Sequence, residues 1–406
     1  MEEKQMENKM NPLLSEENKL WVEKTYEKLE KKMSAECDRI GTMIPYSTRD
    51  GKYHDLDVRG GIYFWTNGFW TGMLWQMYEA TGDEKYKKAA EGTEERLAET
   101  LTGFTNTDHD IGFLFLPSAV ANYRKTGNET AKVRGLKAAQ ILAGRYNPNG
   151  KYIRAWGNDN ISGREIFQQM FGVEEPLSGW MIIDCMMNIP LLYWASEETK
   201  DPRFAQMAYN HAKTAQQNIV RADGSCNHIA VFDSDTGEFL EAPGGQGFEK
   251  GSSWSRGQAW AVYGFALSYR HTKDESFLDT AKKCAHYCIA SMAANDWLPL
   301  VDYRAPQEPV KYDTTAGMIT ACGLLEIAEH VGEYEKPLYV NAAVRILKAC
   351  DERFSNWNPK EDSIMNGGTF FYHDPEGNDT EVPIIYGDYY FIEALLRLKG
   401  MHLFIW

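Results

Sequence analysis

An aspartate within an apolar run is the first residue of this sequence that points to catalysis. Asp184 stands in GWMIIDCMMNIPLL, residues 179–192, where Asn188 is the only other strongly polar side chain. Burial of an ionised carboxylate is costly, so Asp184 must be hydrogen-bonded or have a raised pKa, and a raised pKa is what a general acid needs near neutral pH. The alternative is a structural aspartate that binds a backbone group. If the run is helical, Asn188 lies one turn further on the same face, which predicts a polar spot inside the fold.

A second charged group, Asp108-His109-Asp110, precedes the apolar string IGFLF. Asp110 is at the N-terminus of a predicted helix, where the helix dipole favours an ionised carboxylate. The structural alternative is a helix cap beside a loop histidine. Metal binding has less support because it needs further ligands at a suitable spacing.

Arginine and aromatic residues supply groups that suit an acidic sugar. Arg256 and Trp260 are four residues apart, so a helix places both on one face. A guanidinium beside an indole suits a planar carboxylate on a ring, although an arginine stacked for packing has the same spacing. His228 is a further donor, with a structural histidine as the alternative. The candidate platforms for sugar rings, with core packing as their alternative, are Trp65, Trp70 and Trp156.

The composition excludes several classes of protein. The chain has 406 residues and a net charge of −15 without a basic stripe, which argues against nucleic-acid binding and requires that any anion site be local. Seven scattered cysteines without a CxxC pair indicate reduced core residues, the polar N-terminus does not resemble a signal peptide, and no apolar run is long enough to span a membrane. We therefore expect a cytoplasmic protein that binds no membrane. The sequence leaves monomer and homodimer open.

Familiar catalytic motifs are absent from the chain. GxSxG, P-loop, strand-borne GxGxxG and HExxH strings do not occur. Carboxylate or histidine chemistry remains, and we expect no metal or other cofactor.

Repeated helical hairpins predict the fold that positions these residues. An aromatic-rich helix ends in a short polar turn, and an amphipathic helix follows with apolar residues at three- and four-residue spacing. Gly or Lys closes the first helix, and Asp, Asn or Glu caps or starts the next. The turns are Thr81-Gly82-Asp83, Thr126-Gly127-Asn128, Thr199-Lys200-Asp201, Thr272-Lys273-Asp274 and Val331-Gly332-Glu333.

These hairpins and a last helix at about 386–398 indicate six helix pairs, and hence an all-α fold. We expect one (α/α)6 barrel over residues 1–406, with residues 1–12 as a flexible tail and the more apolar helix of each pair inside. Residues 223–251 are expected to hold a hairpin or an extended loop. The long connections, which would gather at one rim and form the pocket, are about 40–64, 102–110, 147–178, 222–253, 295–312 and 355–384.

Several strings taken together resemble glycoside hydrolase family 88, the unsaturated glucuronyl hydrolases. The strings, spread over about residues 65–398, are WTNGFWTGMLWQMYEATGD, HDIGFLF, IRAW, GWMIIDCMMNIPLLYWA, SSWSRGQAWAVYG and IYGDYYFIEALLR. As an ordered set they are highly specific, whereas each alone is weak. The resemblance implies an (α/α)6 barrel with Asp184 as the acid/base and Asp110 as a second essential carboxylate. It implies substrate contacts from His109, Trp156, His228, Arg256 and Trp260, with Trp65 and Asn67 in the same rim segment.

The reaction that the resemblance implies is hydration of a double bond rather than ordinary glycoside cleavage. The substrate is a 4,5-unsaturated uronic acid at the non-reducing end of a short acidic oligosaccharide left by a lyase. Protonated Asp184 would donate to C4 and water would add at C5. The resulting hemiketal opens and releases the aglycone. The carboxylate-distance rule for retaining and inverting glycosidases does not transfer to this chemistry.

Three departures from the family pattern lie where the aglycone would sit. The string Gly245-Gln246-Gly247-Phe248 replaces a His-containing string and leaves Gln246 as its candidate substrate contact. The stretch between Trp156 and Gly179 is longer than in the family, and residues 367–373 lack a Ser/Lys cluster for a sulfate group. Linkage, sulfation preference and aglycone identity therefore stay open.

Three other functions compete with this interpretation. An unsaturated rhamnogalacturonyl hydrolase of family 105 shares the barrel and the double-bond chemistry but acts on pectin fragments. A sugar epimerase on the same barrel would prefer a pair of histidine bases, for which only His109 and His228 stand in suitable strings. A non-enzymatic helical scaffold would have no reason to place Asp184 in an apolar run.

Overall fold

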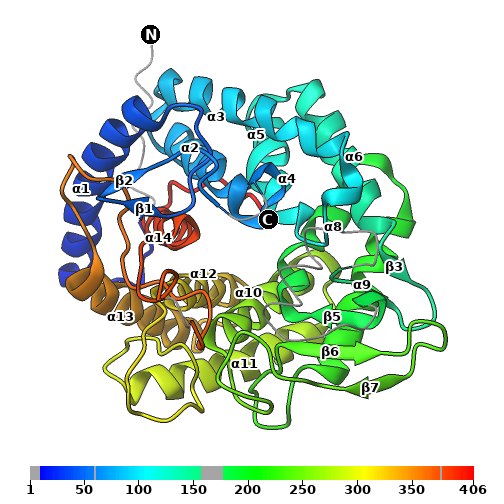
Figure 1. Ribbon diagram of the computed structural model, residues 1–406. Coiled ribbons are helices and arrows are strands. Elements are labelled where there is room, and N and C mark those ends of the chain that lie inside the picture. Colours follow the sequence, from blue (N-terminus) through cyan, green and yellow to red (C-terminus); the bar gives the residue numbers. More distant parts are fainter. Residues whose placement is uncertain (1–9, 59–60, 157–176, 375–376) are drawn as a thin grey trace.

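Two concentric rings of helices form the molecule (Figure 1). The computed structural model describes residues 10–58, 61–156, 177–374 and 377–406. The inner ring consists of α2 (Phe69–Thr81), α4 with α5 (Ile111–Phe115 and Ala121–Thr126, joined by a π-helical turn at Leu116–Val120), α8 (Pro190–Thr199), α10 (Ser255–Thr272), α12 (Thr314–His330) and α14 (Ile385–Lys399). The outer ring consists of α1 (Glu16–Ile40), α3 (Glu84–Leu97), α6 (Glu129–Ala143), α9 (Pro202–Asn218), α11 (Glu275–Ala293) and α13 (Lys336–Phe354). The predicted (α/α)6 barrel is confirmed.

Four of the five predicted turns have the expected geometry. Gly82, Gly127, Lys200 and Lys273 adopt left-handed backbone conformations that end the inner helices. The side chains that cap the following outer helices are Asp83, Asn128, Asp201 and Asp274. The fifth prediction was wrong in detail, because Val331 is extended and α13 begins only after Glu335, with Pro337 in its first turn.

The ring is closed by the two ends of the chain, which the hairpin pattern did not predict. Helix α1 packs outside α14, so the first and last helices form the sixth pair (Figure 1). The predicted tail overlaps the described residues only at 10–12, where the backbone N–H of Asn11 donates to Leu398 at 2.8 Å.

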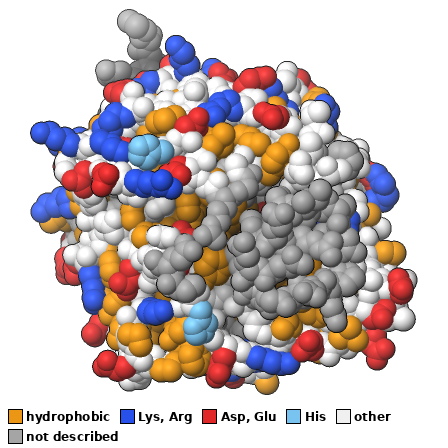
Figure 2. All heavy atoms as spheres, viewed as in Figure 1, with side chains coloured by type: hydrophobic (Ala, Val, Ile, Leu, Met, Phe, Trp, Pro, Cys, Tyr) orange, Lys and Arg blue, Asp and Glu red, His pale blue; other side chains and the backbone are white. Residues whose placement is uncertain are grey.

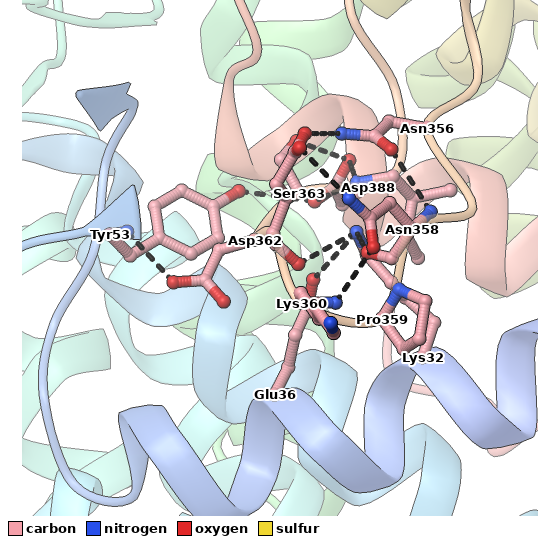
Figure 3. Close-up of polar contacts among 12 residues, drawn as sticks. Lys32, Glu36, Tyr53, Asn356, Asn358, Pro359, Lys360, Asp362, Ser363 and Asp388 are labelled. Atoms are coloured by element: carbon pink, nitrogen blue, oxygen red, sulfur yellow. Dashed lines mark hydrogen bonds and ion pairs between the residues drawn. The ribbon is translucent and has the colours of Figure 1, made fainter. Parts of the chain in front are cut away.

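A buried polar cluster attaches α1 to the loop before α14 (Figure 3). Lys32 donates to the carbonyl oxygens of Asn358 and Glu361, at 2.9 Å each. Asp388, in the first turn of α14, accepts hydrogen bonds from Tyr53, Ser363 and the backbone of Ile364 and Met365. Glu36 lies 3.7 Å from Lys32, and burial raises the pKa of Glu36 well above its usual range. This cluster therefore links three segments that are distant in the sequence.

Short strands occupy the long connections. The strands are β1 (Thr48–Arg49), β2 (Lys52–Tyr53), β3 (Tyr146–Asn147), β4 (Tyr152–Ile153), β5 (Trp180–Ile182), β6 (Ile229–Phe232) and β7 (Phe239–Glu241). Strands β6 and β7 confirm the hairpin expected in residues 223–251, and β5 adds to it as an antiparallel neighbour.

One local prediction was wrong: Asp184 does not lie inside an inner α-helix. Residues 180–182 pair with β6, and Ile183–Met187 form a single 3₁₀ helix before α8 begins at Pro190. The apolar run pairs as a strand because its aromatic and branched side chains suit a sheet, whereas proline suits the first turn of the following helix.

The C-terminal residues enter the barrel at the end opposite the long connections. The side-chain amide of Gln76 bonds to the backbone of Leu403 in both directions, and Arg124 donates to the carbonyl oxygens of Phe404 and Trp406. The Trp406 indole is buried and donates to Glu393 at 2.8 Å. Within the described part of the chain, no helix is long and apolar enough to cross a membrane.

Candidate active site

The candidate residues gather at one end of the inner ring. Trp65 precedes α2, Asp110 precedes α4 and Asp184 precedes α8, while Arg256 and Tyr386 lie in the first turns of α10 and α14. Aromatic contacts join these segments: the ring centroid of Trp65 is 4.8 Å from that of Tyr386 and 6.5 Å from that of Trp260. The N-terminal ends of the inner helices therefore meet around one site.

Asp110 is held by hydrogen bonds from outside its own helix. Its backbone N–H donates to Asp108 Oδ1 at 2.8 Å, and Asn188 Nδ2 donates to Asp110 Oδ1 at 2.8 Å. The predicted alternative, in which the Asp110 side chain caps α4, is wrong, because that carboxylate makes no capping bond. Asn188 Oδ1 accepts from the backbone N–H of Phe113 instead, which leaves the Asp110 carboxylate free for the site.

The electrostatic surroundings of Asp110 correct another expectation. Burial, followed by the charges of Asp108 and Asp184, raises the pKa of Asp110 well above its usual range, against the opposing effects of Asn188 and Arg145. These surroundings oppose the ionised form of Asp110 that the helix terminus was expected to favour. Helix α4 has only five residues, and its dipole does not offset two neighbouring carboxylates.

Asp184 is nearly buried beside His228. Its side chain is 12% exposed, and its Oδ2 lies 3.4 Å from His228 Nε2. His228 Nδ1 accepts a hydrogen bond from the backbone N–H of Gln246 at 3.1 Å, so the proton of a neutral ring lies on Nε2, the nitrogen nearer Asp184. A Cβ atom on residue 245 would stand 1.9 Å from His228 Nδ1, which explains the glycine at that position.

His109 is fully buried on the other side of Asp110. Its Nε2 lies 3.5 Å from Asp110 Oδ1, and its ring meets the Trp156 ring edge-to-face with centroids 6.0 Å apart. Burial, with smaller contributions from Arg145, His211 and His228, lowers the pKa of His109 well below its usual range. The imidazole is therefore neutral at physiological pH.

Arg256 is bound by protein groups. Its Nη1 donates to Asp313 Oδ2 at 2.8 Å and to the Thr369 carbonyl at 2.6 Å, and its Nη2 donates to the Phe370 carbonyl at 2.8 Å. The indole beneath the guanidinium is Trp254, at 4.5 Å, rather than the predicted Trp260. A direct contact with substrate stays a prediction; the observed bonds hold the loop at 369–370.

The other predicted residues divide between the rim and the core. Asn67 donates to the Gly61 carbonyl, and Gln246 Nε2 donates to the Phe370 carbonyl, each at 2.8 Å. Trp65 is partly exposed, whereas Trp260 is buried beneath it. For Trp70 the structural alternative holds, because its buried indole donates to the Gly41 carbonyl at 3.0 Å. The longer stretch between Trp156 and Gly179 lies largely outside the described residues.

Sequence reasoning missed Arg145. Its guanidinium, 7% exposed, donates to the carbonyl oxygens of Thr107, Arg154 and Ala155. The backbone N–H of His109 donates to the same Ala155 carbonyl, so Arg145 joins the Asp110 loop to the segment that carries Trp156. Basic residues are common near the C-terminal ends of helices, so the position of Arg145 just after α6 does not distinguish it in the sequence.

A cleft of about 690 Å³ lies beside the site. Phe64, the neighbour of Trp65, and Phe370, in the loop held by Arg256, belong to its wall together with Arg49 and Asp379. On this face, hydrophobic side chains gather toward the middle and charged side chains stand mainly around the edge (Figure 2). Aromatic rings with interspersed polar groups are typical of surfaces that bind sugars.

Comparisons with known proteins agree with this architecture. Residues 27–296 match the sequence profile of Glycosyl Hydrolase Family 88. An unsaturated glucuronyl hydrolase of Bacillus sp. strain GL1 is 39% identical over 342 residues, or 82% of this chain and 86% of that protein. An unsaturated chondroitin disaccharide hydrolase of Streptococcus pneumoniae is 32% identical over 95% of this chain and 93% of its own length. The crystal structure of the Streptococcus agalactiae unsaturated glucuronyl hydrolase superposes with a TM-score of 0.84 at 33% identity, covering 98% of this chain and 95% of that one.

Proposed function

The chain belongs to glycoside hydrolase family 88, and we propose that it removes a 4,5-unsaturated uronic acid from the non-reducing end of glycosaminoglycan oligosaccharides. The observation that carries this proposal is the pair of nearly buried carboxyl groups of Asp110 and Asp184 at the rim of the barrel. Asn188 donates to the Asp110 carboxylate and to the backbone carbonyl of Asp184. Two carboxyl groups that share one proton can act as an acid and an anion in the same site.

Asp184 serves as the proton donor. Its proton passes to C4 as the C4=C5 π electrons form the new C–H bond, and positive charge develops at C5 and the ring oxygen. Water then adds at C5 and gives a proton to the Asp184 carboxylate, which regenerates the acid. The hemiketal opens and the aglycone leaves. The His228 Nε2–H group, 3.4 Å away, supports the carboxylate form of Asp184 between the two steps.

Asp110 acts in its ionised form: burial opposes this form, and the hydrogen bond from Asn188 favours it. A carboxylate beside the ring stabilises the positive charge at C5 or holds the ring hydroxyls. Neutral His109, in contact with Trp156, supplies an uncharged donor beside Asp110.

The net charge of the protein is negative, but the helix dipoles supply positive potential locally at the site, where an acidic sugar can bind. The positive N-terminal ends of α2, α8, α10, α12 and α14 face the site. Asp313 neutralises Arg256, so the guanidinium mainly orders the rim loop, and its Nε remains for a ligand. The neighbouring cleft would accept the aglycone.

The comparisons do not favour the two rival enzymes. The relatives are unsaturated glucuronyl hydrolases and unsaturated chondroitin disaccharide hydrolases. One of them, the unsaturated glucuronyl hydrolase of Bacillus sp. GL1 with a known crystal structure, is responsible for the degradation of glycosaminoglycan. These names support the double-bond chemistry and a glycosaminoglycan fragment over a pectin fragment or an epimerisation.

The test follows the ultraviolet absorbance of the C4=C5 uronate in unsaturated disaccharides from chondroitin, hyaluronan and heparin. We expect the absorbance to fall with the wild-type protein and to stay constant with Asp184→Asn. Glu36→Gln is the matched control, because it also changes a buried carboxyl to an amide but lies in the α1 cluster. If the absorbance stays constant with all three substrates but falls with an unsaturated rhamnogalacturonan disaccharide, the result would favour the family 105 activity.

We also propose a cytoplasmic location, which requires import of the lyase product. Recovery of the protein from the medium of its native host would contradict this. Size-exclusion chromatography with light scattering would decide between monomer and homodimer.

A further inference from the structure

Asn188 binds the Asp110 carboxylate and the backbone of Asp184. Its Nδ2 donates to Asp110 Oδ1 at 2.8 Å and to the Asp184 carbonyl at 3.3 Å, while its Oδ1 accepts from the Phe113 backbone N–H at 2.8 Å. The side chain is fully buried. One amide thus fixes the start of α4, the Asp110 side chain and the 3₁₀ helix that carries Asp184.

The surrounding packing leaves no freedom for this amide. A Cβ atom on Gly112 would lie 2.5 Å from Asn188 Oδ1 and 2.6 Å from its Cα, so glycine permits the close approach of the two segments. A hydrogen bond cannot be kept by a longer side chain in such a confined space.

We infer that Asn188 is a positioning residue of the proposed reaction, whose amide orients the Asp110 carboxyl group and favours its carboxylate form against burial and the neighbouring carboxyl groups. This inference rests on the proposed function. An amide N–H can donate only to an acceptor, so it favours the carboxylate form of Asp110. Its oxygen is already occupied by Phe113, which fixes the orientation of the amide.

The other groups around Asp110 do not bind and favour its carboxylate form in the way that Asn188 does. Asp108 and Asp184 both oppose the ionisation of Asp110. Arg145 favours it through its charge, but the Arg145 guanidinium donates its hydrogen bonds to backbone carbonyl groups. His109 is neutral, and burial raises the pKa of the Cys185 thiol well above its usual range, so that it carries no charge. Asn188 is the group that binds the Asp110 carboxylate directly among the described residues.

The test compares pH profiles of kcat/KM for two variants. Asn188→Ala removes the donor, so the acid limb, on which Asp110 takes up a proton, should move up by about one pH unit. Asn188→Asp keeps an acceptor for Phe113 but must be protonated to donate, so the alkaline limb should move down and activity should recover in acid. A purely structural asparagine would lower activity at every pH and move neither limb, and that result would overturn the inference.

Asn122→Asp is the matched control. Asn122 is a buried amide on α5 that donates to the Glu94 carboxylate at 2.6 Å and accepts from Thr126, away from the site. We expect it to lower stability and leave both limbs unchanged. If Asn122→Asp moved the limbs of the pH profile as far as the Asn188 variants do, the shifts would come from a general loss of packing, and the inference would be overturned.

A measurement without substrate separates this inference from the proposed function. Infrared titration follows the carboxyl band that disappears in Asp110→Asn. In Asn188→Ala the midpoint of this band should rise by about one pH unit. An unchanged midpoint would overturn the role of Asn188 even if the enzyme is active, whereas a shifted midpoint in a protein inactive on all three disaccharides would contradict only the proposed function.

Discussion

The two ends of the barrel bury carboxylates in opposite surroundings. At the end of the barrel that the C-terminal residues enter, here called the closed end, Glu326 lies between Arg397 and Arg270. Arg397 Nη2 is 2.6 Å from Glu326 Oε2. At the open end, Asp110 lies beside Asp108 and Asp184, and the nearest guanidinium, Arg145, is directed at backbone carbonyls.

The pKa values move in opposite directions for this reason. Burial alone would raise the pKa of Glu326, but Arg397, His330 and Arg270 outweigh burial and hold it well below its usual range. At Asp110, burial and the neighbouring carboxylates act together and raise the pKa. Paired charges thus stabilise the fold at one end, whereas unpaired charges at the other end destabilise it and are available for chemistry.

Asp110→Asn should produce the largest functional effect among the variants that compare the two ends of the barrel. We expect kcat/KM to fall about a thousandfold, equal to about 4 kcal/mol in the activation barrier, because the site loses its anion. The same change should raise Tm, because an unfavourable buried charge is removed. Steady-state kinetics and thermal unfolding of one preparation check both. A lower Tm would show that Asp110 stabilises the fold, which would remove the contrast between the two ends.

Glu326→Gln should produce the largest effect on stability. Removal of the carboxylate leaves Glu329 as the remaining shared partner of Arg397 and Arg270 and should cost about 3 kcal/mol in the free energy of unfolding. Urea unfolding measures this cost. The kcat/KM of the folded fraction should stay at the wild-type value, and a matching loss of activity would show that the closed end participates in the reaction.

The pH dependence of these two stability changes should differ in sign. Glu326 has a lowered pKa, so its contribution is present above the ordinary value of 4.5 and is lost as the pH falls. Asp110 has a raised pKa, so its destabilisation is present at neutral pH and disappears in acid. The gain from Asp110→Asn should therefore shrink between pH 7 and pH 4, whereas the loss from Glu326→Gln should stay constant down to about pH 4.5 and shrink only between pH 4.5 and about pH 3. Thermal unfolding across this range, at constant ionic strength, tests the pair.

Glu36→Gln should have the smallest effect. The Glu36 carboxyl is fully buried with a raised pKa, so an uncharged amide of the same shape should change the free energy of unfolding by less than about 1 kcal/mol. Asp388→Asn in the same cluster is the contrasting variant, because it disrupts four hydrogen bonds from Tyr53, Ser363, Ile364 and Met365. Equal losses from both variants would show that Glu36 is ionised and paired with Lys32.

The amino-acid sequence by itself determined the helical hairpins and the identity of the acidic residues. Turns such as Thr81-Gly82-Asp83 combine a left-handed position with a capping side chain, and both properties are local. Asp184 stands out because a charged residue in an apolar run is costly wherever the run folds. The ordered strings were sufficient to indicate the family.

Tertiary structure decided how the candidate residues are charged and bonded. The strand at 180–182 forms because β6 lies beside it, and α1 joins the ring through contacts with residues more than 300 positions away. The raised pKa of Asp110 comes from burial and Asp108 and, in smaller part, from Asp184, which is distant in the sequence. The partner of Arg256 is Asp313, which no spacing along the chain indicates. Charge interactions act through space and burial, so their outcome follows from which segments meet and not from the spacing of residues along the chain.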